Sequence, residues 1–486
     1  IRTIEQKARE QSDFLRIKIT GSVCVKSHFL SNFIKFSVGF LLTFCSVFCW
    51  SGQRDTSSLL RDYVRLDTTN PPGNEALGAA FFAEIFAAHG IEHEVIEVAP
   101  GRANIWARLP GGDQPALLLL HHMDVVPADP SRWQHPPFAG LIGDVYLHGR
   151  GTLDSKSLGI FQLQAMLALK AQNKALNRDL IFLATADEEA GGQYGVGWLL
   201  DKRPELFERI GAVLNEGGRG DVRDGKLTFG IEVTQKLPLW LRINASGVSG
   251  HGAMPRVDSA SQQLIRGLAK LEQFQFPAQL LPGVKRYFNK LAADFPAPWS
   301  KRLSNVEALV SSPQQMAELR EFDQRLHAQL RSTCAITRLQ AGDKINVVAP
   351  EAWAEIDCRL LPNHKPQQAL QSITKALDDE GLTITPLLSF EPGISGQDNF
   401  LYRAIEGNLR QQFPAATIVP RMAAGFTDSH FFREKGIPAY GFVPHILDAE
   451  QAGGIHGDNE KISLENIRFG SEFMRSLIEK ICLDAP

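Results

Sequence analysis

Cysteine is scarce in this sequence, and its distribution excludes a fold stapled by many disulfides. Six of the 486 residues are cysteine, and half of these fall within the first 50 residues. Cys334, Cys358 and Cys482 remain for the rest of the chain. Three scattered cysteines form no disulfide framework, and the lack of a CxxC spacing argues against a structural zinc site. We therefore expect the fold to depend on a buried apolar core.

An excess of charge of either sign is also missing. The formal net charge is −3, and charged residues make up 22% of the chain. The sequence contains no long basic block, so nucleic acid is not expected as a partner. With 44% hydrophobic residues, the composition is that of a globular protein, and the length suffices for two or three domains.

A long uncharged segment, residues 36–50 (FSVGFLLTFCSVFCW), lies near the start of the chain. A membrane span needs about 20 apolar residues, whereas the core of a signal peptide needs about 7–15. The segment therefore favours a leader over residues 1–53 and an exported protein, either periplasmic or secreted. An uncleaved membrane anchor is the alternative. A buried core helix is a weaker one, because the segment lies outside the region that bears motifs.

From residue 54 onward, apolar strands alternate with helices. The spacing of apolar residues predicts helices over 75–90 and 157–172, between strands over 91–98, 104–109, 116–124, 179–189 and 212–218. Strands that are apolar throughout belong to a sheet covered by helices on both faces. The fold class expected is α/β with a mostly parallel central sheet.

The pattern changes near residue 236. PLWLRINASGVSGHGAMP alternates like a strand with one exposed face, and a long polar helical stretch follows it. The strands INVVAP and AWAEIDCRLLP come next, and helix and strand alternation resumes near residue 365. We therefore expect an α/β domain in two parts, residues 54–235 and 365–486, interrupted by an inserted α+β domain over residues 236–364.

Histidines and carboxylates gather where these apolar strands end. Ligands of open parallel sheets bind in the crevice beyond the carboxyl ends of the strands. Carboxylates that share such a crevice repel one another, and divalent cations can cancel their charge. Histidine, aspartate and glutamate are ordinary zinc ligands, and a pair of metals needs about five of them. The residues concerned are His122, Asp124, Asp154, Asp187, Glu188, Glu189, Glu216 and His456.

Each of these short motifs has an ordinary alternative. A single His-x-Asp occurs often by chance, an acidic triplet is usually a solvated turn or a helix start, and NEGG alone indicates a turn. His121 is interpreted as a strand residue that faces away from the crevice. The joint pattern, in this order, carries the prediction of a metal centre.

The ordered motifs resemble those of the di-zinc metallopeptidases and amidohydrolases, the family of aminoacylase, carboxypeptidase S, glutamate carboxypeptidase and succinyl-diaminopimelate desuccinylase. The resemblance covers residues 55–475, and WQHPPFAGLIGDVYLHGRGTLD is most similar to the carboxypeptidase S and N-acyl-amino-acid hydrolase branch. The motifs that carry it are RLDTTNPPGNE, LLLHHMDVVP, YLHGRGTLDSK, LIFLATADEEAGG, VLNEGG, GVSGHGAMP, KINVVAP, DCRLLP, GFTDSHFF and GIHGDNEKI.

The resemblance implies two zinc ions per chain, for which Co²⁺ or Mn²⁺ can substitute. It implies that Asp154 bridges the two metals, and that Glu188 is the general base. Asp124 corresponds to the carboxylate that orients the imidazole of His122. Ser155 departs from the family pattern, which has an acidic residue or Asn there. The implied metal ligands are His122, Asp154, Glu189, Glu216 and His456.

Four further residues correspond to parts of the family's substrate site. His251, in the insertion, corresponds to a histidine that stabilises the oxyanion and often reaches the active site of a partner subunit. Asn346 and Arg359 correspond to residues that bind near the substrate's carboxylate, and Gly425 to a residue of the substrate-binding loop. A surface salt bridge is the alternative for Arg359. The resemblance also implies a homodimer through the inserted domain, with a monomer as the alternative.

The function expected is hydrolysis of an amide bond next to a free carboxylate, as in a carboxypeptidase-type metallopeptidase. An aminoacylase-type hydrolase of N-acyl amino acids is the alternative, and a dipeptidase is less favoured. The substrate is accordingly a small peptide or an N-acyl amino acid. A scaffold with an inactive site would lack a metal ligand, and none is missing. A serine hydrolase would show a GxSxG elbow, which the sequence lacks.

Overall fold

The structure, a computed structural model, describes residues 55–254 and 256–483. The leader expected over residues 1–53 lies outside the described residues, so the export signal stays a prediction. Within the described part of the chain, no helix combines the length and the apolarity needed to cross a lipid bilayer.

Ten strands form the large sheet, in the order β1-β2-β6-β3-β7-β17-β9-β8-β18, with β16 paired to β9. Its central strands β6, β3 and β7 run parallel, whereas β1 and β2 are antiparallel at one edge. The strands are β1 (Glu92–Ala99), β2 (Arg102–Leu109), β3 (Gln114–His122), β6 (Arg178–Thr185), β7 (Ile210–Asn215), β8 (Arg219–Arg223), β9 (Lys226–Gln235), β16 (Thr417–Ala423), β17 (Ala439–Gly441) and β18 (Ile446–Leu447).

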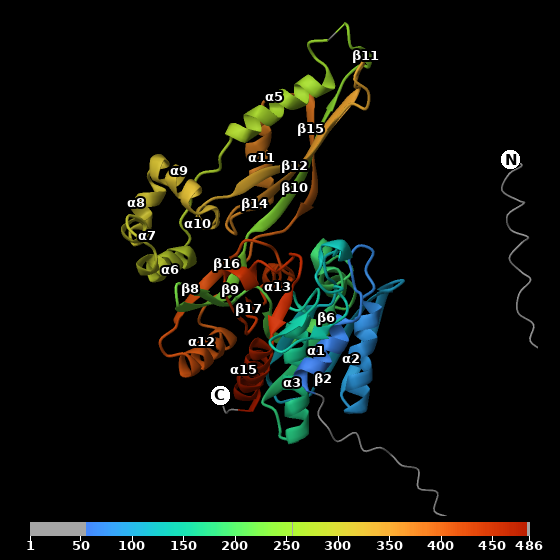
Figure 1. Ribbon diagram of the computed structural model, residues 1–486, viewed down its shortest axis with the longest axis vertical. Coiled ribbons are helices and arrows are strands. Elements are labelled where there is room, and N and C mark those ends of the chain that lie inside the picture. Colours follow the sequence, from blue (N-terminus) through green and yellow to red (C-terminus); the bar gives the residue numbers. More distant parts are fainter. Residues whose placement is uncertain (1–54, 255, 484–486) are drawn as a thin grey trace, which may run out of the picture. The chain divides into compact units, whose positions relative to one another are not determined.

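Both faces of this sheet are buried, as the apolar strands predicted. Alternate residues of β3 enter different cores: Leu117 and Leu119 pack on one face, and Leu118 and Leu120 on the other. The first core is covered by α1 (Thr56–Val64), α2 (Ala76–Ala88), α3 (Lys156–Gln172), α12 (Phe400–Gln412) and α15 (Leu464–Leu483), and the second by α4 (Val196–Lys202) and α13 (Ser429–Glu434) (Figure 1). Two helical layers around a parallel sheet confirm the α/β expectation.

The chain leaves β9 at Lys236 and enters a smaller antiparallel sheet with the order β12-β14-β10-β15. Its inner face packs on α5 (Ala260–Gln273) and α11 (Pro366–Leu377), which lie along the sheet (Figure 1). Its outer face carries polar and charged side chains, in keeping with the alternating pattern. The strands are β10 (Leu237–Ser246), β12 (Thr333–Ala341), β14 (Glu351–Leu360) and β15 (Leu382–Ser389).

The smaller sheet corrects the domain boundary that the sequence indicated. The insertion was expected to end at residue 364, but α11 and β15 lie beyond that point and belong to the smaller sheet. β15 pairs with β10, and Ile373 and Leu377 of α11 pack in its core. The chain returns to the large sheet only after Ser389. Alternating helices and strands occur in both domains, so periodicity alone could not locate the return.

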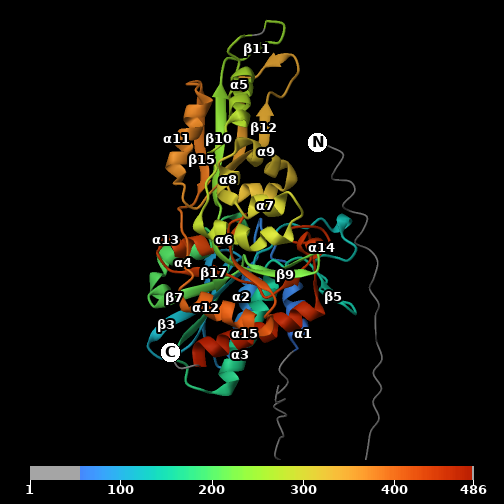
Figure 2. The same ribbon diagram turned by 90° about the vertical axis from the view of Figure 1, so that its left-hand side faces the viewer.

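The polar helical stretch of the insertion divides into five short helices with a core of their own. Leu303, Leu309 and Leu319 are central to this core, which also receives Leu361 from the end of β14 and Met422 from β16. The helices are α6 (Pro282–Leu291), α7 (Trp299–Leu303), α8 (Val306–Val310), α9 (Pro313–Phe322) and α10 (Gln324–Ala328) (Figure 2).

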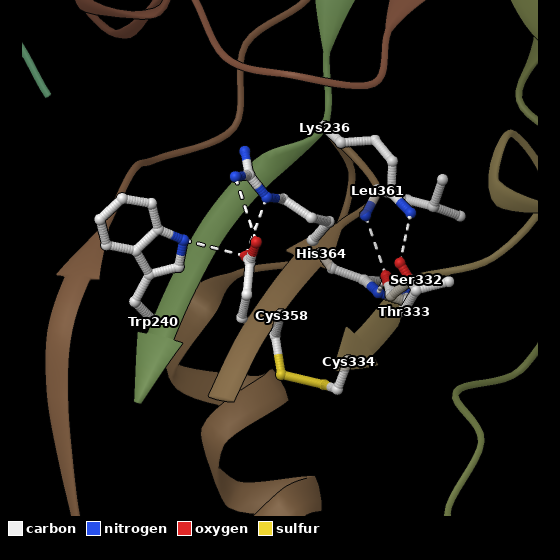
Figure 3. The surroundings of a disulfide bond; sticks show 10 residues. Lys236, Trp240, Ser332, Thr333, Cys334, Cys358, Leu361 and His364 are labelled. Carbon is white, nitrogen blue, oxygen red and sulfur yellow. Dashed lines mark hydrogen bonds and ion pairs between the residues drawn. A yellow bond between two sulfur atoms is a disulfide. The ribbon is translucent and has the colours of Figure 1, made fainter. Parts of the chain in front are cut away.

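A disulfide joins Cys334 of β12 to Cys358 of β14, 24 residues apart in sequence. The two cysteines are direct partners in the register of the two strands, so their side chains project from the same face (Figure 3). The expectation that the cysteines after residue 50 form no disulfide framework holds only in part, because sequence spacing does not reveal strand register. Cys482 is buried and free.

Candidate metal centre

Three parallel strands end at the same edge of the large sheet, and each is followed by predicted site residues. His122 is the last residue of β3, Glu216 directly follows β7, and Glu188 and Glu189 lie in a 3₁₀ turn just after β6. This arrangement is the one that the crevice rule for parallel sheets predicts.

Two loops bring the remaining predicted ligands to this edge. Asp154 precedes α3, and His456 lies between α14 (Ala449–Ala452) and β19 (Lys461–Ser463). One carboxylate oxygen of Asp154, Oδ1, lies 3.0 Å from His122 Nε2, and its other oxygen, Oδ2, lies 3.1 Å from His456 Nε2. Asp154 therefore faces two histidines at once, with a separate oxygen for each.

The five predicted ligands form two groups that share Asp154. In one group, Glu216 Oε1 lies 3.6 Å from His122 Nε2. In the other, Glu189 Oε1 lies 3.2 Å from His456 Nε2. Within each group, one ligand atom from every residue lies within 4.8 Å of the others. A third group of that size combines His122 with Glu188 and Glu189.

The pKa shifts of these side chains indicate that the positive groups of the cluster do not neutralise all of its carboxylates. Burial raises the pKa of Glu216 to about 7 and the pKa of Glu188 well above its usual range, with a further increase from neighbouring carboxylates. The neighbouring carboxylates of Asp154 and Glu189 raise the pKa of His456 to about 10. Carboxylates that hold protons, beside a histidine that keeps its charge, indicate a site that divalent cations would neutralise.

The donor atoms also fit such cations. Glu189 Oε1 is buried beside His456, yet it accepts no hydrogen bond of ordinary geometry. A buried carboxylate oxygen without a hydrogen bond is costly unless another group satisfies it. Imidazole nitrogens together with carboxylate oxygens suit zinc and similar divalent metals.

Asp124 contacts both His122 and the turn that carries Glu188 and Glu189. Its carboxylate accepts the backbone N–H groups of Glu188 and Glu189, each at 3.1 Å. His122 Nδ1 lies 2.9 Å from the backbone oxygen of Asp124 but 3.6 Å from its carboxylate. The backbone oxygen of Asp124 is therefore the nearer contact of the imidazole, and its carboxylate faces the imidazole and also fixes the turn that carries Glu188 and Glu189.

A buried ionic network supports that turn from the other side. Asp187, which begins the turn, adopts a left-handed backbone conformation with φ of 73°. Its carboxylate binds Arg102 at 2.8 Å, and Arg102 also pairs with Glu75 at 2.7 Å. Asn70 donates to both Asp124 and Asp187, at 2.8 and 3.2 Å. These contacts stabilise a conformation that a residue with a Cβ atom otherwise adopts rarely.

Comparison with known proteins agrees with this geometry. The family described as Peptidase family M20/M25/M40 matches residues 118–480. The chain belongs to this family. It is 31% identical over 410 residues to the N-fatty-acyl-amino acid synthase/hydrolase of Xenopus tropicalis, covering 82% of this chain and 78% of that protein. It is 26% identical over 401 residues to aminoacylase-1B of Rattus norvegicus, covering 81% of this chain and 87% of that protein.

The fold is similar to that of an M20 family metallo-carboxypeptidase from Sulfolobus solfataricus, with a TM-score of 0.68 and 18% identity. That superposition covers 87% of this chain and 98% of the solved one. Membership of the M20/M25/M40 family confirms the predicted family, the α/β fold with its insertion, and the class of metal-dependent amide hydrolase.

Arg359 and Gly425 lie together near the start of the insertion. Arg359 is paired across the sheet with Pro238, next to the point where the chain leaves β9. Its guanidinium lies 5.4 Å from the ring of Phe426, the residue after Gly425. Asp357 accepts from Arg359 Nε at 2.8 Å, whereas Nη1 is buried and makes no hydrogen bond. The salt bridge that was the alternative for Arg359 is therefore present, and one donor nitrogen remains for a ligand.

His251 and Asn346 lie together at the opposite end of the insertion. β10 has 10 residues, and at about 3.3 Å per residue it carries the chain roughly 30 Å from β9 before His251 is reached. His251 belongs to β11 (Gly250–His251), which pairs with β13 (Val347–Val348), and Gly252 N donates to Asn346 O at 3.0 Å. Figure 1 shows β11 at the tip of the smaller sheet. The structure of one chain does not bring these two residues to the metal cluster.

His121 has the structural role expected of it. It is fully buried, and its ring packs against Phe82 and Phe182 at 5.4 and 5.3 Å between ring centroids. Burial lowers the pKa of His121 to about 3, so it stays neutral. Neighbouring histidines of β3 therefore face opposite sides, because side chains alternate along a strand.

Sequence reasoning did not single out several residues around the cluster. Asp428 accepts from Thr185 Oγ1 at 3.0 Å, and burial raises its pKa to about 8. Glu460 is fully buried against the loop that carries Asp154. Both acids, like Asn70, lie within the motifs GFTDSHFF, GIHGDNEKI and RLDTTNPPGNE. The motifs therefore contained these residues, but no role was assigned to them from the sequence.

Proposed function

We propose that this protein is a di-zinc hydrolase that cleaves an amide bond next to a free carboxylate. The observation that carries the proposal is the position of Asp154, whose two oxygens face His122 and His456 at 3.0 and 3.1 Å. A carboxylate between two ligand groups is what a pair of catalytic metals needs. Glu216 and Glu189 complete the two groups.

When bound, the two cations would supply Lewis-acid chemistry at the amide carbonyl. Glu188 would take the proton from the attacking water and then pass it to the leaving amine. Burial and neighbouring carboxylates raise the pKa of Glu188, and a base that returns its proton needs such a raised value. Asp124 holds the N–H groups of Glu188 and Glu189 and so keeps the base apart from its metal-binding neighbour.

Arg359 would bind the carboxylate of the substrate's amino acid. Its Nη1 is buried without a hydrogen-bond acceptor, and a substrate carboxylate would provide one. The substrate class we place first is N-acyl amino acids, because the relative that is 31% identical hydrolyses compounds of that class by its name. Peptides cleaved at the C-terminal residue come second and would use the same contacts.

The position of His251 supports a homodimer. Because β10 separates His251 from the large sheet by roughly 30 Å of strand, its own chain does not deliver it to Glu188. A second copy, bound through the insertion, would bring His251 to the oxyanion of the first. The uncharged segment 36–50 supports export of this enzyme.

The test is an activity screen of the full chain after zinc loading. N-acyl amino acids, dipeptides and matched amides without the carboxylate are compared, and bound zinc is counted by mass spectrometry. We expect two zinc ions per chain and faster hydrolysis of substrates that carry the carboxylate. Protein treated with a chelator is the control. Hydrolysis that is unchanged after complete zinc removal would contradict the proposal.

A further inference from the structure

One carboxylate, that of Glu460, joins the two loops that complete the metal centre. Its Oε1 accepts the backbone N–H of Leu153 at 2.6 Å and that of Asp154 at 3.2 Å. Its Oε2 accepts the N–H of Gly151 at 2.9 Å and Nη1 of Arg150 at 2.8 Å. Four donors from one short segment therefore converge on a side chain that lies more than 300 residues away in sequence.

The donor arrangement requires a carboxylate. Three main-chain donors and a guanidinium supply only N–H groups, so the partner has to accept with both of its oxygens. The side chain of Glu460 is 0% exposed, and that of Arg150 is 3% exposed. A glutamine at position 460 would turn an N–H group toward these donors and leave at least one of them without a partner.

Glu460 follows His456 by four residues, and the backbone reinforces the link. Gly149 N donates to Glu460 O at 3.0 Å, and the next residues, β19, pair with β5 (Tyr146–His148). The side chain of His456 is 52% exposed, whereas that of His122 is 1% exposed. Few packing contacts hold His456, so its position depends on the loop that Glu460 anchors.

We infer that Glu460 is a positioning residue that couples the two halves of the metal centre. It fixes the main chain at Asp154 and, on its own loop, the approach of His456 to the second oxygen of Asp154. His122 and Glu216 depend less on this contact, because strands β3 and β7 hold them. This inference rests on the proposed function, since it concerns the same pair of cations.

Replacing Glu460 should therefore lower metal affinity unequally at the two ligand groups. Replacing Glu460 removes two contacts from the group of Asp154, Glu189 and His456. One fixes the main chain of Asp154, and the other fixes the loop that carries His456. The other group, His122, Asp154 and Glu216, keeps two ligands at the ends of buried strands. If Glu460 only stabilised the fold, its replacement would instead lower the stability of the whole chain and reduce metal affinity equally at both groups.

The experiment is a calorimetric titration of Zn²⁺ into chelator-treated full chains. Wild type, Glu460→Gln and Arg150→Gln are compared with Glu450→Gln, which replaces a carboxylate that is 86% exposed just before the same loop. For Glu460→Gln we expect one of the two sites to lose about tenfold to a hundredfold in affinity, the range typical of outer partners of metal ligands, and the other site to change by less than about threefold. Arg150→Gln should show the same pattern with a smaller loss.

Two further readouts separate positioning from folding. Excess zinc should restore turnover of Glu460→Gln, and the thermal midpoint of each metal-free variant shows whether it is folded. Equal loss at both sites, or unchanged titration of Glu460→Gln and Arg150→Gln, would overturn the inference. If Glu460→Gln does not fold, the milder Arg150→Gln decides by the same criterion. A wild-type chain that binds no zinc would instead overturn the proposed function.

Discussion

The two sheets of the protein bury their surfaces differently, and the difference separates the predicted site residues into two classes. Every residue of β6 in the large sheet is buried, whereas β12 at the edge of the smaller sheet is exposed along most of its length. Residues at the ends of the large sheet's strands are held from both faces, and they converge within one chain. Residues at the tip of the smaller sheet, such as His251, do not reach the cluster of their own chain.

The comparison teaches which residues the fold of one chain brings to the cluster and which residues it leaves away from it. His122 and Glu216 occupy strand ends that two helical layers enclose. Arg359 lies on the smaller sheet but at its end near β9, where it is paired with Pro238. His251 is the clearest member of the second class.

Glu188→Gln should have the largest effect. The loss of the general base should lower kcat by about 10²–10⁴-fold and leave zinc binding intact, because Glu188 is outside the two groups that share Asp154. Steady-state kinetics and a metal count check this, with the exposed Glu205→Gln as control. A rate near that of wild type would remove the role of base from Glu188.

His251→Ala should have the next largest effect, about 100-fold in kcat, as for loss of one oxyanion donor. Co-expression of the His251→Ala and Glu188→Ala chains tests whether His251 acts in the active site of a second copy. Mixed dimers would each contain one complete site, so about a quarter of wild-type activity should return for random pairing. A mixture that stays as inactive as the separate variants would show that His251 does not act on a partner.

Arg359→Ala should act mainly on KM. Loss of charged hydrogen bonds to the substrate's carboxylate should raise KM by about 10–100-fold for substrates that carry this group. Kinetics with matched amides that lack the carboxylate provide the control, and there KM should hardly change. An equal effect on both substrate sets would mean that Arg359 supports the fold through Asp357 and Phe426 instead.

The smallest effect expected is the pH dependence of stability in the metal-free protein. Glu216 has a pKa of about 7 in the fold, above its ordinary value near 4.5, so the folded chain binds this proton more tightly than the unfolded chain does. The unfolding free energy should therefore fall as pH rises from about 4.5 to 7. His456, with its pKa raised to about 10, should continue the fall as pH rises from about 6.5 to 10.

Zinc should reverse this trend, because it replaces the protons on the same groups. Thermal unfolding with and without zinc, at about pH 5.5, 7 and 8.5, measures the effect. The gain in melting temperature from zinc should increase with pH. If the gain in melting temperature stayed constant or decreased with pH, zinc binding would not displace the protons of Glu216 and His456.

Much of the centre could be predicted from the sequence because its ligands follow apolar strands. HHMD, DEE and NEGG each lie at the carboxyl end of a strand that the apolar pattern identifies, and parallel strands end at one edge. The contacts of Asp124 with the main chain of Glu188 and Glu189 could not be predicted in the same way. They depend on a loop conformation that no spacing encodes.

The sequence by itself determined strands β1, β2, β3, β6 and β7, the two-sided burial of the large sheet and the identity of the residues at its edge, because hydrophobic periodicity reports which faces leave water. Only the tertiary structure decided the contacts that join distant segments. Strand register decided the pairing of Cys334 with Cys358 and the end of the insertion after Ser389. Loop packing decided the hydrogen bonds of Glu460 to the loop that carries Asp154. Those arrangements depend on the geometry of the whole chain, which local residue patterns do not encode.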